Sequence, residues 1–207
     1  MSVAGVNDAT KRWKEWCDNV QAQTTVNRAE SEADKQARIK RARADYAFFV
    51  NYYFPHYTDD PATGKHTESA PFHIEAANKI RKNRNLKAAF KWARGHAKST
   101  HMDVFTPLWL MFQPLRLINF MVVVGKSEDA ACRLLGDIQA ELEYNDRLKR
   151  DFGEQKPAGG DWTDGEFKAN CGVKFLACGR GQSPRGLRDR EARPDYIVID
   201  DLDDDEL

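Results

Sequence analysis

Cysteine is scarce in this sequence, and no two cysteines form a Cys-x-x-Cys pair. A chain of 207 residues contains only Cys17, Cys132, Cys171 and Cys178. Disulfide-built folds and zinc sites need denser or more closely spaced cysteines, so we expect reduced thiols that bind no metal. Long apolar runs are missing as well, because no stretch reaches the roughly 20 residues of a membrane span. The N-terminal segment has no apolar h-region, so we expect neither secretion nor a membrane partner.

An excess of either charge is also missing, since 32 basic residues balance 32 acidic ones. The charges are unevenly placed, however. Residues 195–207 hold seven acidic side chains and no basic one, so residues 1–194 carry seven more basic than acidic side chains. The zero net charge therefore does not exclude a polyanionic partner, although a solvated basic surface is the alternative.

The first part of the chain predicts helices followed by an aromatic cluster. Residues 8–46 contain no Gly or Pro and are rich in Ala, Glu, Lys, Arg and Gln, which predicts two helices. Residues 46–57, YAFFVNYYFPHY, are densely aromatic, and we interpret them as core; base stacking is the alternative. We therefore expect a helical N-terminal extension over residues 1–45 and a main domain over residues 46–207.

Beyond the aromatic cluster, apolar runs that predict strands alternate with segments that predict helices. Strands are expected at 86–93 (LKAAFKWA), at 116–125, in a hairpin over 166–178 that turns near 170–172, and at 196–200. Helices are expected at 72–83, at 98–112 with a kink or end at Pro107, and after the N-cap Ser127. This alternation predicts an α/β fold with a mainly parallel sheet flanked by helices.

The segment KWARGHAKST, residues 91–100, is similar to a phosphate-binding loop. It departs from the pattern G-x-x-x-x-G-K-[ST] at Trp92 and Ala97. Such a loop needs a strand, a turn whose N–H groups point inward, and a helix that begins with Lys-Ser or Lys-Thr. Gly95 lies in the turn and can adopt a positive φ, whereas Ala97 requires an ordinary φ. The alternative interpretation is an exposed basic turn.

The second half of a nucleotide site would be an apolar strand that ends in two acids. One acid holds Mg²⁺ and the other activates water. The run YIVIDD ends in Asp200 and Asp201, although acids also follow strands as turn or cap residues. Together, in this order and 102 residues apart from Lys98 to Asp200, the two halves predict that the chain binds ATP or GTP with Mg²⁺.

Four stretches together resemble the large terminase subunit of tailed bacteriophages and prophages, the ATPase that drives double-stranded DNA into an empty capsid. They are ARGHAKST (93–100), MVVVGKSEDAACRLL (121–135), GVKFLACGRGQSPRGLR (172–188) and RPDYIVIDDLDDDE (193–206). The likeness covers residues 46–207. It implies a P-loop NTPase fold of the RecA-like (ASCE) type, with the basic loop as Walker A and the acid-tipped strand as Walker B.

The resemblance also implies roles for individual positions. Lys98 and Ser99 would bind the β/γ-phosphates, with Ser99 and Asp200 on Mg²⁺. Arg94 would stabilise charge on the transferring phosphoryl group, and Asp201 would act as the catalytic acid that activates water. The remaining ATP-binding positions are Gly95, His96, Ala97 and Thr100 in the loop, with Phe72 and His73 as adenine contacts.

Some of these positions have simpler explanations. An amphipathic helix over residues 72–83 needs an apolar Phe72 in any case, whether or not that residue contacts adenine. Arg185 and Arg188 would sense the nucleotide of a neighbouring subunit or touch DNA, and the alternative for both is a solvated loop.

The resemblance further implies partners and a setting. The partners are double-stranded DNA, a portal protein and a small terminase subunit, with a homo-oligomeric ring on the portal in the cytoplasm of a bacterial host. The family continues past the acid-tipped strand into further strands and a nuclease, so we expect a truncated ATPase part with an incomplete sheet. The alternatives are another RecA-like DNA-dependent ATPase of the helicase or partition type, and a fragment that binds nucleotide without turnover.

Overall fold

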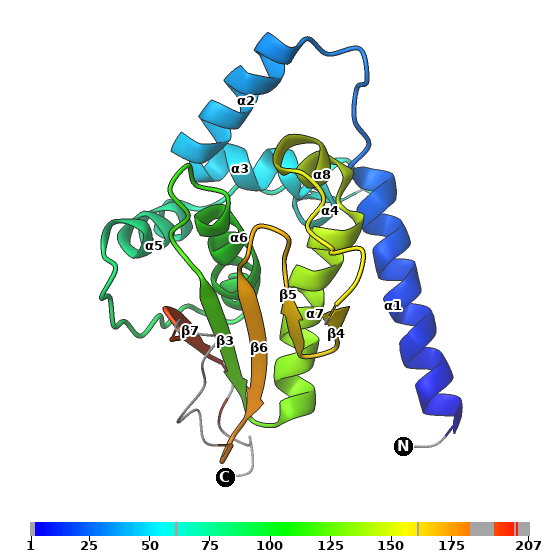
Figure 1. Cartoon of the computed structure of the whole chain (residues 1–207), viewed down its shortest axis with the longest axis vertical. Helices are drawn as coiled ribbons and strands as arrows, with labels where there is room; N and C mark the ends of the chain where they lie inside the picture. Colours follow the sequence, from blue (N-terminus) through cyan, green and yellow to red (C-terminus); the bar gives the residue numbers. More distant parts are fainter. Residues whose placement is uncertain (1–2, 61, 161, 183–192, 201, 203–207) are drawn as a thin grey trace. The chain divides into compact units, whose positions relative to one another are not determined.

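A computed structural model describes residues 3–60, 62–160, 162–182, 193–200 and 202 (Figure 1). The chain separates into two compact units. The first comprises Met1–Ser69 and Ala140–Gly153, and the second comprises Ala70–Gln139 and Glu154–Leu207. The aromatic segment 46–57 therefore groups with the N-terminal helices, and the division differs from the boundary expected after residue 45. Helix α7 (Glu128–Tyr144) contributes to both units.

The first unit is mainly helical. Its helices are α1 (Val3–Gln23), α2 (Glu32–Ala44), α3 (Tyr46–Tyr53), α4 (Pro55–Thr58) and α8 (Asp146–Phe152), with a small pair of strands, β1 (Asp59–Asp60) and β2 (Lys65–His66). The two helices expected over residues 8–46 are confirmed as α1 and α2. The hydroxyl of Ser31 accepts the backbone N–H of Asp34 at 3.1 Å and so caps the start of α2.

Aromatic side chains of α3 and the residue after it form the core of this unit. Tyr46, Phe49, Tyr53 and Phe54 are each at most 1% exposed. The rings of Phe49 and Tyr53 lie 5.0 Å apart, and those of Phe49 and Phe54 lie 5.5 Å apart in an edge-to-face arrangement. The interpretation of this segment as core is confirmed for these four residues.

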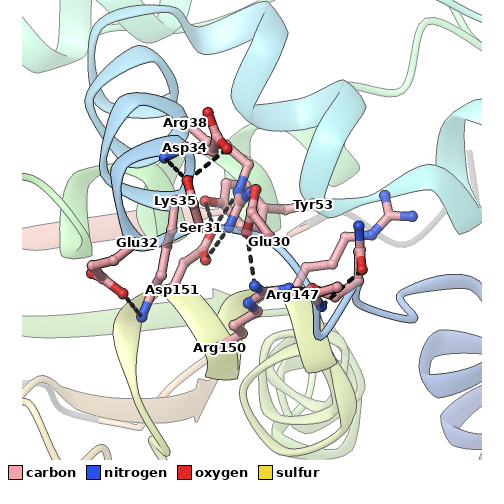
Figure 2. Close-up of polar contacts among 12 residues, drawn as sticks. Glu30, Ser31, Glu32, Asp34, Lys35, Arg38, Tyr53, Arg147, Arg150 and Asp151 are labelled. Carbon is pink, nitrogen blue, oxygen red and sulfur yellow. Dashed lines mark hydrogen bonds and ion pairs between the residues drawn. The ribbon is translucent and has the colours of Figure 1, made fainter.

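A charged cluster joins α2 to α8 within the first unit (Figure 2). Arg38 donates from Nε and Nη2 to the two oxygens of Asp151, at 2.9 and 2.7 Å. The hydroxyl of Tyr53 donates to Asp151 Oδ2 at 2.7 Å. Arg38 also pairs with Glu30, which pairs with Arg150 at 2.9 Å. Both oxygens of the Asp151 carboxylate therefore accept hydrogen bonds, and its side chain is only 1% exposed.

The second unit contains a five-stranded sheet and helices. The helical elements are α5 (Pro71–Lys82), the π-helical turn η1 (Thr100–Phe105), α6 (Thr106–Met111) and the first part of α7. The strands are β3 (Phe120–Gly125), β4 (Trp162–Thr163), β5 (Glu166–Lys168), β6 (Lys174–Gly179) and β7 (Tyr196–Ile199). Their order is β4-β5-β6-β3-β7, with β7 at one edge (Figure 1).

The sheet is mixed, whereas a mainly parallel sheet was expected. Strands β6, β3 and β7 run parallel, and β4, β5 and β6 pair antiparallel. The antiparallel part contains the hairpin expected to turn near residues 170–172, which is confirmed by the Gly172 N–H that donates to the Ala169 carbonyl at 2.7 Å. The helix predicted after Ser127 is also confirmed, because the Ser127 hydroxyl accepts the Ala130 N–H at 3.2 Å as α7 begins.

One carboxylate fixes the start of β7 against the start of β3. Asp195 accepts the backbone N–H groups of Asn119 and Phe120, both at 2.9 Å. The parallel register then places Ile199 opposite Val124. Asp200 consequently follows at the carboxyl end of β7, which is the edge of a parallel sheet where ligands commonly bind.

The prediction of a strand at residues 86–93 is wrong, because these residues belong to no strand in the described part of the chain. Ala88 and Ala89 are exposed. The segment 86–90 lines a cavity of about 1130 Å³, and β7 lines it as well. A strand needs a neighbour for its backbone hydrogen bonds, and β7 pairs only with β3 among the described residues. The apolar segment and the open strand edge thus face one cavity without pairing.

The helix expected at 98–112 forms and does not end at Pro107, because α6 continues past this residue and a π-helical turn precedes it. The N–H of Thr106 donates to the carbonyl of His101, five residues back. Pro107 has no N–H, so an α-helix could not supply the usual donor to the carbonyl of Asp103. A widened turn before the proline accommodates this missing donor, and α6 continues to Met111.

Candidate functional site

The basic loop ends in an unusual backbone conformation. Residues 94–97 are exposed, and Gly95 has φ +82°, as expected. Ala97 has φ +50°, so the expectation of an ordinary φ at this position is wrong. A left-handed conformation costs a residue with a side chain roughly 1–2 kcal/mol, so the surrounding contacts must hold it. One of these is the His101 N–H, which donates to the Ala97 carbonyl at 3.0 Å.

Lys98 and Ser99, which begin the helical segment after this loop, both contact Asp200. The Nζ of Lys98 donates to Asp200 Oδ1, and the Ser99 hydroxyl donates to Oδ2 at 2.6 Å. The expected proximity of the loop and the acid-tipped strand is therefore confirmed as geometry. Asp200 is 8% exposed, whereas the Lys98 side chain is 38% exposed.

A third titratable residue, Asp103, belongs to this cluster, and the sequence analysis did not predict it. It lies in η1, is 2% exposed and hydrogen-bonds to Asp200. Its Oδ2 has no hydrogen-bond partner among the described residues. The signal in the sequence was a lone acid within the otherwise apolar stretch from Met102 to Phe112. We call Lys98, Ser99, Asp103 and Asp200 the acid–lysine cluster.

The pKa values of the two carboxyl groups in this cluster are shifted in opposite directions. Burial, followed by the charge of Asp200, raises the pKa of Asp103 to about 8. Burial also acts to raise the pKa of Asp200, but hydrogen bonds from Lys98 and Ser99 and the charge of Lys98 outweigh it, and the pKa of Asp200 is lowered. At neutral pH the pair therefore favours a protonated Asp103 that donates to an ionised Asp200.

The acid–lysine cluster borders the cavity between the open edge of β7 and the segment 86–90. Lys98, Asp103 and Asp200 all line this cavity. Its walls also include Ile197 and Ile199, which are 58% and 60% exposed. The unpartnered oxygen thus belongs to a residue that lines an open space.

Next to the loop, His73 is buried and both of its ring nitrogens are engaged. Nδ1 accepts the Ala70 N–H at 3.0 Å, and Nε2 contacts the His96 carbonyl at 2.9 Å. The ring stacks on His101 with centroids 3.7 Å apart and planes 17° apart. Both nitrogens are therefore used by backbone groups of the protein itself.

Phe72 and Trp92 form a more accessible aromatic surface beside the loop. The Phe72 ring lies 5.1 Å from that of Trp92 and 5.7 Å from that of His96. Phe72 is 37% exposed, so one predicted adenine contact lies on the surface next to the loop. Trp92 replaces the first glycine of the general pattern and packs in this aromatic surface.

The structure brings only some of the predicted site residues together. Arg94 is exposed and makes no hydrogen bond or ion pair with residues that the structure describes. Thr100 is the first residue of η1 and is half-buried. Three predicted positions, Asp201, Arg185 and Arg188, lie outside the described residues.

The donors of the acid–lysine cluster fit a hard divalent cation. Mg²⁺ prefers oxygen ligands and usually keeps several waters, so it needs few ligands from the protein. Ser99 and Asp200 offer a hydroxyl and a carboxylate 2.6 Å apart, and Asp103 adds a second carboxyl group. In the described parts of the chain, no group of three His, Cys, Asp or Glu side chains is arranged to hold a metal by itself.

Over the described ranges, no helix is both long enough and apolar enough to cross a membrane. Compared with known proteins, the chain matches no family model, no curated protein and no solved structure.

Proposed function

We propose that this chain binds ATP with Mg²⁺ at the basic loop and the acid–lysine cluster, and hydrolyses it. The observation that carries this proposal is the convergence of Lys98 and Ser99 on Asp200 across about 100 residues of sequence. A lysine, a hydroxyl and a carboxylate are the three groups that a triphosphate with Mg²⁺ needs from a phosphate loop and its partner strand. The adjacent cavity offers space beside them.

Each side chain has a distinct role in this proposal. Lys98 leaves its ion pair with Asp200 and neutralises the β/γ-phosphates, and Ser99 and Asp200 hold Mg²⁺ directly or through water. Arg94, exposed in the loop and without a protein partner among the described residues, stabilises charge on the transferring phosphoryl group. Asp201 is proposed to activate the attacking water.

We further propose that this ATPase is the motor part of a DNA-packaging terminase large subunit. The resemblance of the four stretches named above supports this assignment, and so does the excess of seven basic side chains over residues 1–194. In that setting the chain assembles as a homo-oligomeric ring on a portal protein in the cytoplasm of a bacterial host. It receives double-stranded DNA from a small terminase subunit and moves it into a procapsid.

Equilibrium binding of a fluorescent ATP analogue, with and without millimolar Mg²⁺, tests the nucleotide site. Lys98→Ala should weaken binding by ~100-fold, because charged hydrogen bonds to phosphate are lost. Lys91→Ala is the matched control, since Lys91 is an exposed lysine only seven residues away, and it should change affinity less than about twofold. If the wild-type chain binds no nucleotide, or Lys98→Ala binds as well as Lys91→Ala, the proposal is wrong.

Phosphate release tests the reaction and its coupling to DNA. Arg94→Ala should lower turnover by ~100-fold or more while leaving ATP affinity nearly unchanged, because its interaction forms only in the transition state. Double-stranded DNA should stimulate turnover. Stimulation by single-stranded DNA alone would favour the helicase alternative, and binding without any phosphate release would favour a nucleotide-binding fragment.

A further inference from the structure

The ring of His73 bridges two backbone segments of the second unit. Its Nδ1 accepts the N–H of Ala70 at 3.0 Å, so this nitrogen carries no proton. Its Nε2 faces the carbonyl of His96 at 2.9 Å, and only a protonated nitrogen can donate to that oxygen. The two neighbours therefore select one neutral tautomer, with the proton on Nε2.

The surroundings of His73 reinforce the neutral form. The side chain is 7% exposed, and its ring stacks on His101 with a centroid distance of 3.7 Å. Burial lowers the pKa of His73, and burial together with His73 lowers the pKa of His101 to about 3. A proton on Nδ1 would also point at the Ala70 N–H, and two hydrogen-bond donors facing each other repel.

The carbonyl that His73 holds belongs to the peptide just before the strained residue of the loop. Ala97 has φ +50°, and this conformation persists only where neighbouring contacts over-determine it. The peptide before Ala97 is held through the His96 carbonyl, and the Ala97 carbonyl itself accepts the His101 N–H at 3.0 Å. The His73 ring and the His101 backbone N–H thus contact the carbonyls on the two sides of Ala97, the residue that precedes Lys98.

We propose that His73 is a positioning residue that sets the conformation of the basic loop through the His96 carbonyl, so that Lys98 and Ser99 are presented to a triphosphate. This inference rests on the proposed nucleotide function, but it assigns His73 a role through the protein backbone. It differs from the adenine contact expected from the sequence, because both ring nitrogens are already occupied by backbone groups.

Two substitutions by amide side chains each keep one of the two hydrogen bonds made by the His73 ring and remove the other. In His73→Gln the side-chain amide reaches as far as Nε2 and can still donate to the His96 carbonyl. In His73→Asn the amide lies near Nδ1 and can only replace the acceptor for Ala70. Each variant leaves one of the two backbone groups without its partner on residue 73, so the two are matched in lost hydrogen bonds and differ in which segment they release.

Binding of Mg²⁺ with tripolyphosphate, and separately with ATP, gives the functional readout. We expect His73→Asn to weaken both ligands about tenfold, and His73→Gln to remain within about threefold of wild type. An adenine-contacting role predicts that both variants weaken ATP equally and leave tripolyphosphate unchanged, which would overturn the proposal. Equal loss of both ligands in both variants, in step with lost stability, would also overturn it.

Measurements without nucleotide keep this inference separate from the proposed function. The ¹⁵N shifts of the wild-type His73 ring should report a proton on Nε2 at neutral pH, and a proton on Nδ1 would refute the assigned geometry. Amide hydrogen exchange of residues 95–99 should rise about tenfold in His73→Asn and stay near wild type in His73→Gln. Unchanged exchange in His73→Asn overturns the positioning role, whereas altered exchange in a chain that binds no nucleotide refutes only the ATPase proposal.

Discussion

Two clusters of buried charge, one in each unit, differ in whether their carboxyl oxygens are fully used. In the first unit, Asp151 accepts from both Arg38 and Tyr53, and no oxygen of the carboxylate is spare. In the second unit, Asp200 accepts from Lys98 and Ser99, but Oδ2 of Asp103 has no partner among the described residues.

The difference separates a closed structural cluster from the cluster proposed to bind nucleotide. A bidentate arginine and a tyrosine hydroxyl close the Asp151 site, and burial followed by the hydrogen bond to Asp151 raises the pKa of Tyr53. The acid–lysine cluster lines a cavity and contains a lysine that is 38% exposed on its side chain. Unused buried polar atoms beside an open space can accept a ligand, whereas a closed network can only stabilise the fold.

The largest expected effect is on the closed cluster. Asp151→Ala should lower the free energy of unfolding by about 3–5 kcal/mol, because it leaves Arg38 buried without its bidentate partner. Urea unfolding measures this change, and ATP affinity of the folded variant should stay within about twofold of wild type. Asp8→Ala, which removes an exposed pair with Arg12, is the control and should cost less than about 0.5 kcal/mol. A loss at Asp151 no larger than at Asp8 would break the comparison.

The pH dependence of the open cluster is an effect of comparable size. Because the pKa of Asp103 is raised to about 8 from 3.8, the folded state binds one more proton than the unfolded state between these values. Stability from this group is present below pH 4 and is lost as the pH rises toward 8, by up to about 1.4 kcal/mol per pH unit.

Asp103→Asn should flatten this dependence and make the protein more stable than wild type at pH 8. Urea unfolding between pH 5 and pH 8 in the presence of a chelator measures it, and Asp8→Asn serves as the control. If wild type and Asp103→Asn lose stability in parallel as the pH rises, the carboxyl pair does not share a proton as described.

The loop itself offers a smaller effect. Ala97→Gly should raise the free energy of unfolding by about 0.5 kcal/mol, because relief of the left-handed strain exceeds the added chain entropy of glycine. Ala93→Gly, in the same exposed loop at an ordinary φ, is the matched control and should lower stability slightly. A loss of stability in both variants would show that Ala97 carries no strain.

The smallest expected effect concerns the open edge of β7. Ile199→Lys should change the free energy of unfolding by less than about 0.5 kcal/mol, since Ile199 is 60% exposed, while it reduces self-association at high concentration. Sedimentation velocity measures the association. Val198→Lys is the matched control, because this neighbour points to the opposite, half-buried face and should destabilise the protein. Equal self-association of wild type and Ile199→Lys would show that the open edge of β7 does not mediate association between chains.

The parts of the fold predicted correctly are those with strong local patterns. The apolar run ending at Gly125 predicted β3, and Ser127 predicted the start of α7. The proximity of Lys98 and Asp200 was predicted by pairing the basic loop with the acid-tipped strand as two halves of one site, although the segment before the loop forms no strand. Periodicity and capping are encoded within a few residues, so they can be read without tertiary information.

The remaining features depended on distant contacts. The run 86–93 has the composition of a strand, but the described chain places a cavity where its pairing neighbour would be. The peptide before Ala97 is contacted by His73, 23 residues before His96 in the sequence, and no local pattern predicts this contact. Asp103 gained its importance only when Asp200, 97 residues later in the sequence, folded beside it.

The acid–lysine cluster can form only after β3 and β7 have paired, because Asp200 directly follows β7. Met121 pairs with Tyr196, so the 74 residues between them must be ordered or looped out before the ladder closes. Non-local parallel pairs form late in folding, because the loss of chain entropy precedes the gain in contacts. Asp200 therefore reaches Lys98 only where this long-range pairing has formed, so the geometry of the acid–lysine cluster depends on the β3–β7 ladder.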